Sequence, residues 1–451
     1  SANKVDAVVI RGSGNVGIND TTPDHKLVID DDASSGKGLH VLGGGGGGTL
    51  ARFERNVGSS GMYVDINCNS GDPQIRFTES SGVEWAIGVE GNVFEIVDGS
   101  NLSGTSALEI STTGATFSGS IHVPGGSAVA TNEAFGTDAL LNNTTGSNNT
   151  ANGYRALFTN TTGASNTATG LQALYYNTIA SNNTANGLNA LHHNTTGAHN
   201  VAVGYSALVN NTTGNYNIAI GDLALSSNTT ASTNIGIGKG ALATTTTGAS
   251  NTATGYTAMY YNTTGARNTA TGYEALLSTT TGYDNTATGV QALRGNTTGY
   301  RNTATGYLAL YQNTTGTYNV ATGMQALRYN TTGTQNTGHG YLTLYLNTTG
   351  VSNTATGNHA LRHNTTGGSN VANGYEALYS NTTASNNVAT GRGALRANTT
   401  GHSNTANGHN SLYASTTGNY NTASGAYALD HNTTGSSNTA TGRTALRNNT
   451  T

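Results

Sequence analysis

From residue 136 onward, apolar and polar positions recur with a period of 17 residues. Glycine occupies one position of this period in 19 successive copies, from Gly136 to Gly442, with no insertion or deletion between them. If this glycine is numbered 0, Leu occupies position +4 in every copy except at Met259, and Ala occupies +3 except at Thr343 and Ser411. A fixed short period of this kind predicts a repeat architecture.

The polar positions are equally regular. Thr occupies +8 in all 19 copies, and Asn occupies +13 in every copy that reaches that far. Positions +5, +6, +11 and +12 vary freely. The constant positions indicate structural roles. The variable positions are interpreted as facing either solvent or a binding partner that selects particular side chains.

The repeat predicts short strands and turns. Gly and Asn recur too often for a helix, and Thr suits strands. The segments Asn-Thr-Ala-Thr-Gly and Tyr-x-Ala-Leu-x-x each predict a strand, and Asn-Thr-Thr-Gly predicts the turn between them. One repeat is then one coil of a parallel β-solenoid with an Asn ladder along it. Coils spaced by about 4.8 Å give a rod on the order of 85 Å long.

The apolar content of each coil is small. A coil offers one large apolar residue, the Leu, and two Ala. A buried Leu contributes about 2 kcal/mol, whereas each ordered residue costs about 1–2 kcal/mol of backbone entropy. We therefore expect the Leu stripe to be shared between chains, with three coils around a common axis.

The repeat resembles a known family. Asn-Thr-Ala-Thr-Gly-Tyr-x-Ala-Leu is similar to the Asn-x-Ala-x-Gly-x-x-Ala repeat of trimeric autotransporter adhesin heads. The resemblance covers residues 136–451 and implies a homotrimeric, left-handed parallel β-roll. The repeat of those heads is usually shorter, so the longer Asn-Thr-Thr-Gly loop is a departure that bears on the shape of the coil.

The N-terminal part differs in pattern. Residues 1–38 contain Gly14-Asn-Val-Gly-Ile-Asn-Asp-Thr-Thr-Pro-Asp-His-Lys-Leu-Val-Ile29, which resembles a segment common in phage tail-fibre proteins. Residues 39–118 alternate between apolar and polar positions and predict a small antiparallel β domain. Residues 119–135 predict a linker or collar. The strands expected in residues 39–118 are 38–42, 49–55, 62–67, 74–78, 83–89, 93–97, 107–110 and 115–117.

Composition and charge argue against nucleic-acid binding and against a membrane span. Charged residues make up 9% of the chain, and the net charge is -4. Residues 136–451 carry a surplus of only five positive charges along a rod, so no dense basic patch for nucleic acid is expected. No run of 18 apolar residues exists, so we expect no membrane span in this chain.

The sequence predicts no catalytic, metal or cofactor site. Cys68 is the only cysteine and is interpreted as a small buried apolar residue. The consecutive Asp30, Asp31 and Asp32 lack the alternating spacing of a calcium loop and are interpreted as a solvated turn. Histidines of the repeats fall at variable positions and are interpreted as exposed residues without a metal: they include His192, His193, His359 and His363.

Many Asn-x-Thr triplets match the glycosylation acceptor pattern, for example at Asn160 and Asn194. The turn and the ladder already require these residues, so a structural role is the preferred interpretation.

Tyrosine is the most promising functional feature. Of 23 Tyr, 22 lie in the repeats, where equal offsets predict stacking on one face. Tyr can stack on sugar rings, and Arg can bind sugar hydroxyls or carboxylates. Candidate contacts with a glycan or receptor lie five or six residues after their glycines: Tyr260, Tyr261, Arg294, Tyr311 and Arg328. The alternative is that these side chains shield the backbone of the coils.

These observations lead to three functional hypotheses. The first is an elongated all-β homotrimeric fibre, a virion tail fibre or appendage that attaches to a host cell-surface glycan or protein receptor through multivalent weak contacts. The alternative is a trimeric adhesin or extracellular fibre on a bacterial cell surface. The third is a polysaccharide-degrading spike. The first two are not enzymes.

Overall fold

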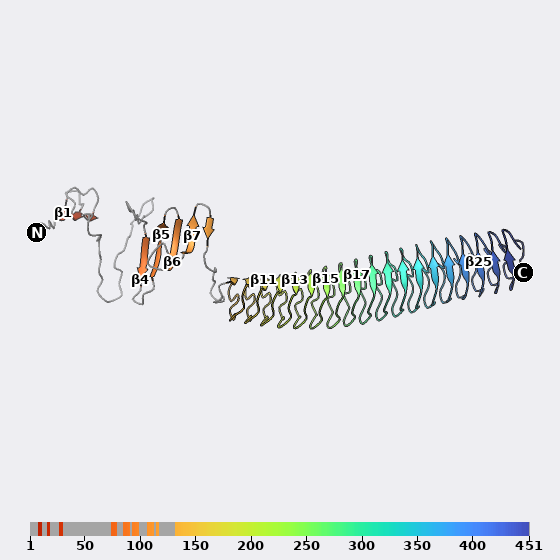
Figure 1. Ribbon diagram of the computed structural model, residues 1–451, viewed down its shortest axis with the longest axis horizontal. Helices are drawn as coiled ribbons and strands as arrows, with labels where there is room; N and C mark the ends of the chain where they lie inside the picture. The colour runs from red at the N-terminus through yellow and green to blue at the C-terminus, as the bar shows by residue number, and fades with distance from the viewer. Residues whose placement is uncertain are drawn as a thin grey trace.

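The computed structural model describes residues 131–450 and, before them, eight short strands (Figure 1). The eight strands are β1 (Val8–Ile10), β2 (Val16–Ile18), β3 (Leu27–Ile29), β4 (Gln74–Thr78), β5 (Glu84–Glu90), β6 (Val93–Asp98), β7 (Ser106–Ser111) and β8 (Gly114–Thr116). All the regular elements of the described residues are strands.

Strands β4 to β8 pair in chain order as an antiparallel sheet, and β1 to β3 form a separate sheet in which β2 is central. Strands β4 to β8 coincide, within one residue at each end, with the last five strands expected from the sequence. The expected strands 38–42, 49–55 and 62–67, together with Cys68 and Asp30 to Asp32, lie outside the described residues.

Residues 131–450 form one parallel β-solenoid in which each 17-residue repeat is one coil (Figure 1). Each strand pairs in register with the equivalent strand of the next coil, for example Ala304 with Ala321. Strand β9 pairs with β10 and β27 pairs with β26. The two ends of so long a stack cannot meet, so the sheet is open. The strands are β9 (Glu133–Phe135), β10 (Thr150–Asn152), β11 (Thr167–Thr169), β12 (Thr184–Asn186), β13 (Val201–Val203), β14 (Ile218–Ile220), β15 (Ile235–Ile237), β16 (Thr252–Thr254), β17 (Thr269–Thr271), β18 (Thr286–Thr288), β19 (Thr303–Thr305), β20 (Val320–Thr322), β21 (Thr337–His339), β22 (Thr354–Thr356), β23 (Val371–Asn373), β24 (Val388–Thr390), β25 (Thr405–Asn407), β26 (Thr422–Ser424) and β27 (Thr439–Thr441).

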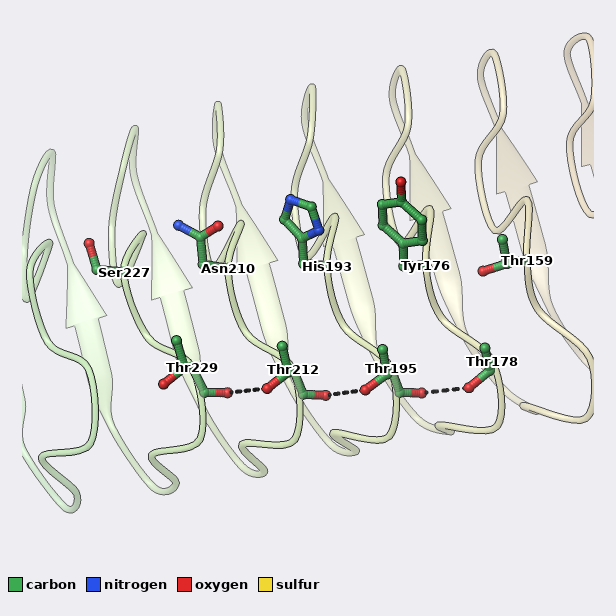
Figure 2. Close-up of a pocket in the computed structure, with 9 residues that line it drawn as sticks. All are labelled: Thr159, Tyr176, Thr178, His193, Thr195, Asn210, Thr212, Ser227 and Thr229. Carbon is green, nitrogen blue, oxygen red and sulfur yellow. Dashed lines mark hydrogen bonds between the residues drawn. The ribbon is translucent and has the colours of Figure 1, made fainter.

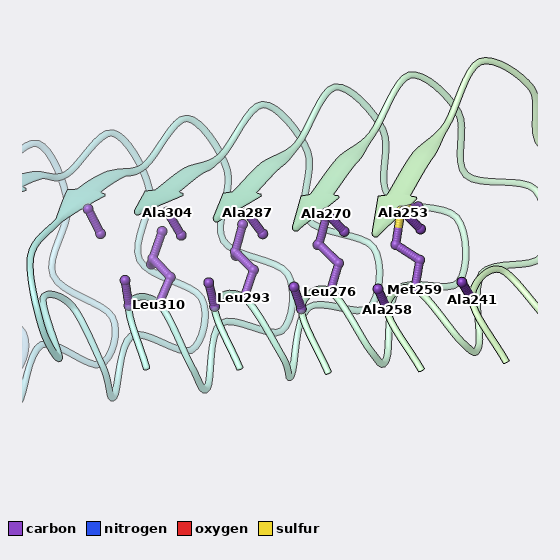
Figure 3. Packing of buried hydrophobic residues seen from close by; sticks show 14 of the residues in the cluster. Ala241, Ala253, Ala258, Met259, Ala270, Leu276, Ala287, Leu293, Ala304 and Leu310 are labelled. Carbon is purple, nitrogen blue, oxygen red and sulfur yellow. The ribbon is translucent and has the colours of Figure 1, made fainter. Parts of the chain in front are cut away.

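The core is a column of Leu and Ala inside each coil. The central residue of each strand, Ala in all but β15 and β21, where it is Gly236 and Gly338, lies on the inner side of the coil, and the Ala meets the Leu and Ala of the segment after the strand (Figure 3). Leu293 and Leu310 have no exposed surface within a single chain. The prediction that the Leu stripe is shared between chains is therefore wrong. The cross-section of the coil is so small that one Leu, stacked between equivalent Leu side chains of the coils on either side, fills it.

The prediction of a second strand in the segment Tyr-x-Ala-Leu-x-x is also wrong. Positions +2 and +4 adopt left-handed backbone conformations, as at Gln325 (φ 58°) and Leu327 (φ 52°), so this segment is a series of turns. Its backbone groups are nevertheless paired between coils. Leu310 donates its N–H to the carbonyl of Ala326 in the next coil, and Gln325 donates to Tyr307 in the preceding coil. The turns therefore stack as regularly as the strands.

The glycine at position 0 is required by close approach between coils. Gly306 has φ 132°, and a Cβ on it would lie 2.6 Å from the carbonyl oxygen of Gly323. A side chain at this position would have to push the next coil away, which accounts for glycine in every copy.

Two ladders of buried Asn and one row of Thr link the coils. At position +7, Asn330 Nδ2 donates to Asn313 Oδ1 (2.8 Å) and to the carbonyl of Gly333 (3.0 Å). At position +13, Asn319 Nδ2 donates to the same Gly333 carbonyl (2.8 Å). The two ladders thus meet at one oxygen in the coils that have Asn at +7, and the loop after this Asn supplies that oxygen.

The Thr at +8 contributes through its hydroxyl group. Thr178 Oγ1 donates to the carbonyl of Thr195 (3.2 Å), and this bond repeats at Thr195 and Thr212 (Figure 2). A hydroxyl that bonds the next coil at every step accounts for the presence of Thr in all copies.

Candidate functional site

The variable positions +5 and +6 form a continuous row along the solenoid, and all five residues proposed as glycan contacts lie in it. Tyr260 and Tyr261 form an edge-to-face pair with ring centres 4.8 Å apart. The guanidinium groups of Arg294 and Arg328 both lie 5.8 Å from the ring centre of Tyr311. One coil, with Leu277 at +5, separates the tyrosine pair from the arginine group. The structure therefore brings the five residues into two neighbouring groups of one row.

The arginine group is the start of a longer run. From Arg294 to Tyr413, position +5 alternates strictly between Arg and Tyr in eight successive coils. Each Arg lies over the ring of each neighbouring Tyr, at 5.1 to 6.0 Å from its centre. We call this run the Arg–Tyr ladder. Its members are Arg294, Tyr311, Arg328, Tyr345, Arg362, Tyr379, Arg396 and Tyr413.

The first and last arginines of the ladder are paired with carboxylates. Arg294 Nε lies 2.7 Å from Glu274, and Arg396 Nε lies 2.6 Å from Glu376. Partial burial alone would raise the pKa of both glutamates. The hydrogen bonds and charge of these arginines, together with hydrogen bonds from Gln291 and Tyr273 to Glu274 and from Tyr375 to Glu376, outweigh it, so the pKa of each carboxyl is lowered. Both glutamates are therefore ionised, and the charges of the two end arginines are compensated.

A second aromatic group lies nearer the N-terminal end of the same row. In position +5, Phe158, Tyr175 and His192 are stacked with ring centres 5.1 and 5.2 Å apart. In position +6, Tyr176 and His193 are stacked at 5.3 Å. The two stacks meet edge to face, and the five rings form one cluster that sequence reasoning did not single out. The sequence signal was adjacent aromatic or His residues at +5 and +6 in two successive coils.

A groove of about 710 Å³ runs beside this cluster (Figure 2). One side is formed by the residues at +6, among them Tyr176, His193 and Asn210, and the other by the Thr row at +8. It crosses five coils, which at about 4.8 Å per coil is a length on the order of 20 Å. Ring faces, Thr methyl groups and a few polar tips along such a groove suit an extended sugar chain.

Position +1 forms a separate exposed row that is mostly apolar or aromatic. Tyr256 and Tyr273 are stacked there, with ring centres 5.6 Å apart. Its exposed large residues are Tyr154, Leu171, Leu188, Tyr205, Tyr256, Tyr273, Val290, Tyr307, Met324, Tyr341 and Tyr375. Tyr256 and Tyr273 were among the tyrosines expected to form rows that could stack on sugars, but no residue of this row was chosen as a candidate contact.

The remaining candidates are the histidines of the repeats and the asparagines of the Asn-x-Thr triplets. Within residues 131–450, no three His, Cys, Asp or Glu side chains converge on a metal position. His192, His359 and His363 are half-buried rather than exposed as expected, and burial lowers the pKa of each ring. Asn160 and Asn194 are fully buried, and their Nδ2 atoms donate within the +7 ladder, which leaves the folded chain no free amide for glycosylation at these positions.

Comparisons with protein-family models, with curated proteins and with solved structures found no match to this chain. Among the described residues, no helix has the length and apolar character needed to cross a membrane.

Proposed function

We propose that this chain forms the shaft of an extracellular fibre that attaches to a cell surface through the +5/+6 row. The proposal is supported by the different roles of the constant and the variable positions within each coil. The constant residues at 0, +3, +4, +8 and +13 are buried or bonded to the next coil, whereas the variable +5/+6 row gathers aromatic rings and arginines. Selection for stability alone does not require such enrichment.

The ligand class proposed is a cell-surface glycan. Stacked rings and a shallow groove offer flat apolar surface with polar edges, which matches the face of a pyranose ring. Each contact contributes little, about 1 kcal/mol, but the row repeats with the coils and several contacts act together. A rod is suited to such binding because it presents the same face repeatedly.

A virion tail fibre or appendage is the leading biological context, because residues 14–29 resemble a segment common in phage tail fibres. A trimeric adhesin on a bacterial surface is the second candidate. It is supported by the Asn-x-Ala-x-Gly motif of the coils, whose central Ala and Gly account for the inward packing and the close coil contact. A polysaccharide-degrading spike gains least support, because the half-buried Glu274 and Glu376 are held ionised by arginines and a general acid needs the opposite.

We also propose a homotrimer, with an interface different from the Leu stripe. The outer face of the strands carries six aliphatic residues on three successive coils, and Ile220 and Ile237 are 39% and 37% exposed. Copies of the same chain would cover this face. The six residues are Val201, Val203, Ile218, Ile220, Ile235 and Ile237.

Light scattering tests the trimer. The unmodified chain is expected at three times its monomer mass, and Ile220→Asp with Ile237→Asp is expected to dissociate it or lower its melting temperature. Tyr420→Asp, at an exposed site of another row, is the control. A stable folded monomer of the unmodified chain would contradict the trimer.

Attachment to glycans is tested by adsorption of fluorescently labelled protein to a panel of bacteria, before and after mild periodate oxidation of their surface sugars. We expect adsorption to some members of the panel and its loss after oxidation. Adsorption that survives oxidation but is lost after protease treatment would point to a protein receptor. No adsorption to any member would argue against an attachment shaft.

A further inference from the structure

The Arg–Tyr ladder carries uncompensated positive charge at its centre. Its end arginines pair with Glu274 and Glu376, but no carboxylate lies within ion-pair distance of Arg328 or Arg362 in the described structure. Between Asp284 and Glu376 the chain has four arginines and no acidic residue. This is an acid-free stretch on a chain whose net charge is negative.

The two central arginines also have unused hydrogen-bonding capacity. Arg328 Nη1 donates to the hydroxyl of Tyr345 (3.2 Å), and Arg362 Nη1 donates to the hydroxyl of Tyr379 (3.1 Å). Arg362 Nη1 also lies 2.8 Å from Nε2 of His363. The Nε atoms of both arginines are shielded from solvent, so a bound anion would be met by the Nη groups. The tyrosines on either side hold each guanidinium in place, so little side-chain entropy is lost when an anion binds.

The spacing of these arginines matches a particular kind of ligand. Successive arginines of the ladder are two coils apart, which is about 10 Å along the solenoid. This length is close to that of a disaccharide in an extended β-linked polysaccharide. Alternate sugars of such a chain face opposite sides, so one side repeats once per disaccharide. An Arg in every second coil would therefore meet the same group of every second sugar.

We propose that the Arg–Tyr ladder binds a linear acidic polysaccharide that carries one carboxylate per disaccharide. The proposal rests on the proposed function and names the ligand class for the part of the row between Arg294 and Tyr413. The inner arginines bind successive carboxylates, and the tyrosine between them contacts the intervening uncharged sugar. Charge-assisted bonds of this kind are screened by salt, so binding weakens as ionic strength rises.

Nucleic acid fits the ladder less well. Its phosphates follow one another more closely than the arginines do, and the ladder is a single row of charge without a broad basic surface. A uniformly charged polyuronate would leave every second carboxylate opposite a tyrosine. The predicted order of affinity is therefore hyaluronan, then polygalacturonate, then single-stranded DNA.

The experiment measures binding of the full chain to hyaluronan oligosaccharides, polygalacturonate and single-stranded DNA at low and physiological salt. Arg328→Gln with Arg362→Gln is expected to weaken hyaluronan binding at least about tenfold. Arg267→Gln with Arg301→Gln removes the same charge from the +12 row, where both arginines pair with Asp284, and is the matched control. It is expected to leave binding unchanged, and melting curves check that both variants are folded.

Arg328→Lys with Arg362→Lys separates charge from geometry. Lys keeps the charge but lacks the planar group that stacks on Tyr, so intermediate affinity is expected. Equal losses in the ladder variant and the +12 variant, or DNA bound as tightly as hyaluronan, would overturn the proposal. If hyaluronan does not bind while periodate-sensitive adsorption to cells persists, the ligand class is wrong but the attachment function stands.

Discussion

The Nδ2 atom of Asn330 lies 2.8 Å from the Oδ1 atom of Asn313, one coil away, and both side chains are fully buried. This contact satisfies a buried polar group with the same residue type of the neighbouring coil. Each side-chain amide donates to one neighbouring coil and accepts from the other. The hydrogen bonds of the ladder are therefore complete only where successive coils all have Asn at +7. A coil that lacks Asn at +7 leaves the Oδ1 atom of the Asn in the preceding coil without a donor.

Three coils break this ladder, and the breaks coincide with unpaired buried atoms. The +7 residues there are Thr245, Thr279 and Ser415. The carbonyl oxygens of the preceding Asn side chains, Asn228, Asn262 and Asn398, have no hydrogen-bond partner, nor do the hydroxyls of Thr279 and Ser415.

Restoring the ladder should stabilise the solenoid. Thr279→Asn and Ser415→Asn are each expected to add about 1 kcal/mol to the free energy of unfolding, because each supplies the missing donor. The reverse change, Asn313→Thr, should destabilise by a similar amount or more. Urea unfolding measures all three. A repaired ladder that is no more stable than the original would mean that water already satisfies the broken positions.

A second prediction concerns the backbone of Leu310, which has φ 50°. Leu310→Ile keeps the volume but places a β-branched side chain in the left-handed region, which should cost about 1–2 kcal/mol. Leu310→Met is the matched control, since Met259 occupies the equivalent position with φ 52° and full burial. Melting temperatures should therefore fall in the order Leu, Met, Ile.

Replacement of Leu310 by Asp would bury an unpaired charge within a single coil and should prevent folding of the central coils. Equal melting temperatures for the Met and Ile variants would show that the backbone at +4 relaxes out of the left-handed region.

Leu310 also illustrates which features of the fold can be predicted from the sequence. The period, the Thr-Ala-Thr strands, the buried Leu and the role of Asn followed from the constant positions. The left-handed turns did not, because Leu rarely adopts positive φ and the segment carries no glycine at +4. A signal was present nonetheless: neither Val nor Ile occurs at +2 or +4 in any of the 19 copies.

The expected sharing of the Leu stripe failed for a related reason. One Leu per coil is too little for a wide solenoid but enough for the narrow one that these turns produce. For the candidate site, equal offsets predicted one stripe of side chains, and within it Arg294 and Arg328 lie on either side of Tyr311. The alternation of Arg and Tyr at +5 was enough to predict that the ladder extends to Tyr413. The pairing of the end arginines with glutamates 20 residues away required the stacked geometry.

A third prediction concerns pH. Burial, and then the positive charge of neighbouring groups, lowers the pKa of His192, His359 and His363. The folded state therefore favours neutral rings, and the unfolded state binds more protons as the pH falls below the ordinary His value of about 6.5. Stability should be fully present above that value, and should decrease as the pH falls towards the pKa values of the folded state.

Melting temperatures between about pH 7.5 and 5 measure this effect. A variant with Gln at the three positions should show a flatter profile over the same range. An unchanged slope in that variant would assign the pH dependence to other groups.

We propose that the +5/+6 row, and not the constant positions of the coils, carries recognition. The most direct test replaces five residues of the row by Ser and measures thermal stability and adsorption to susceptible cells in parallel. The five are Tyr260, Tyr261, Arg294, Tyr311 and Arg328. Five tyrosines of the +1 row, replaced by Ser, are the matched control: Tyr205, Tyr256, Tyr273, Tyr307 and Tyr341. We expect the first variant to fold and assemble but to lose adsorption, and the control to retain it. Undiminished adsorption of the first variant would contradict the claim and make the solenoid a passive spacer.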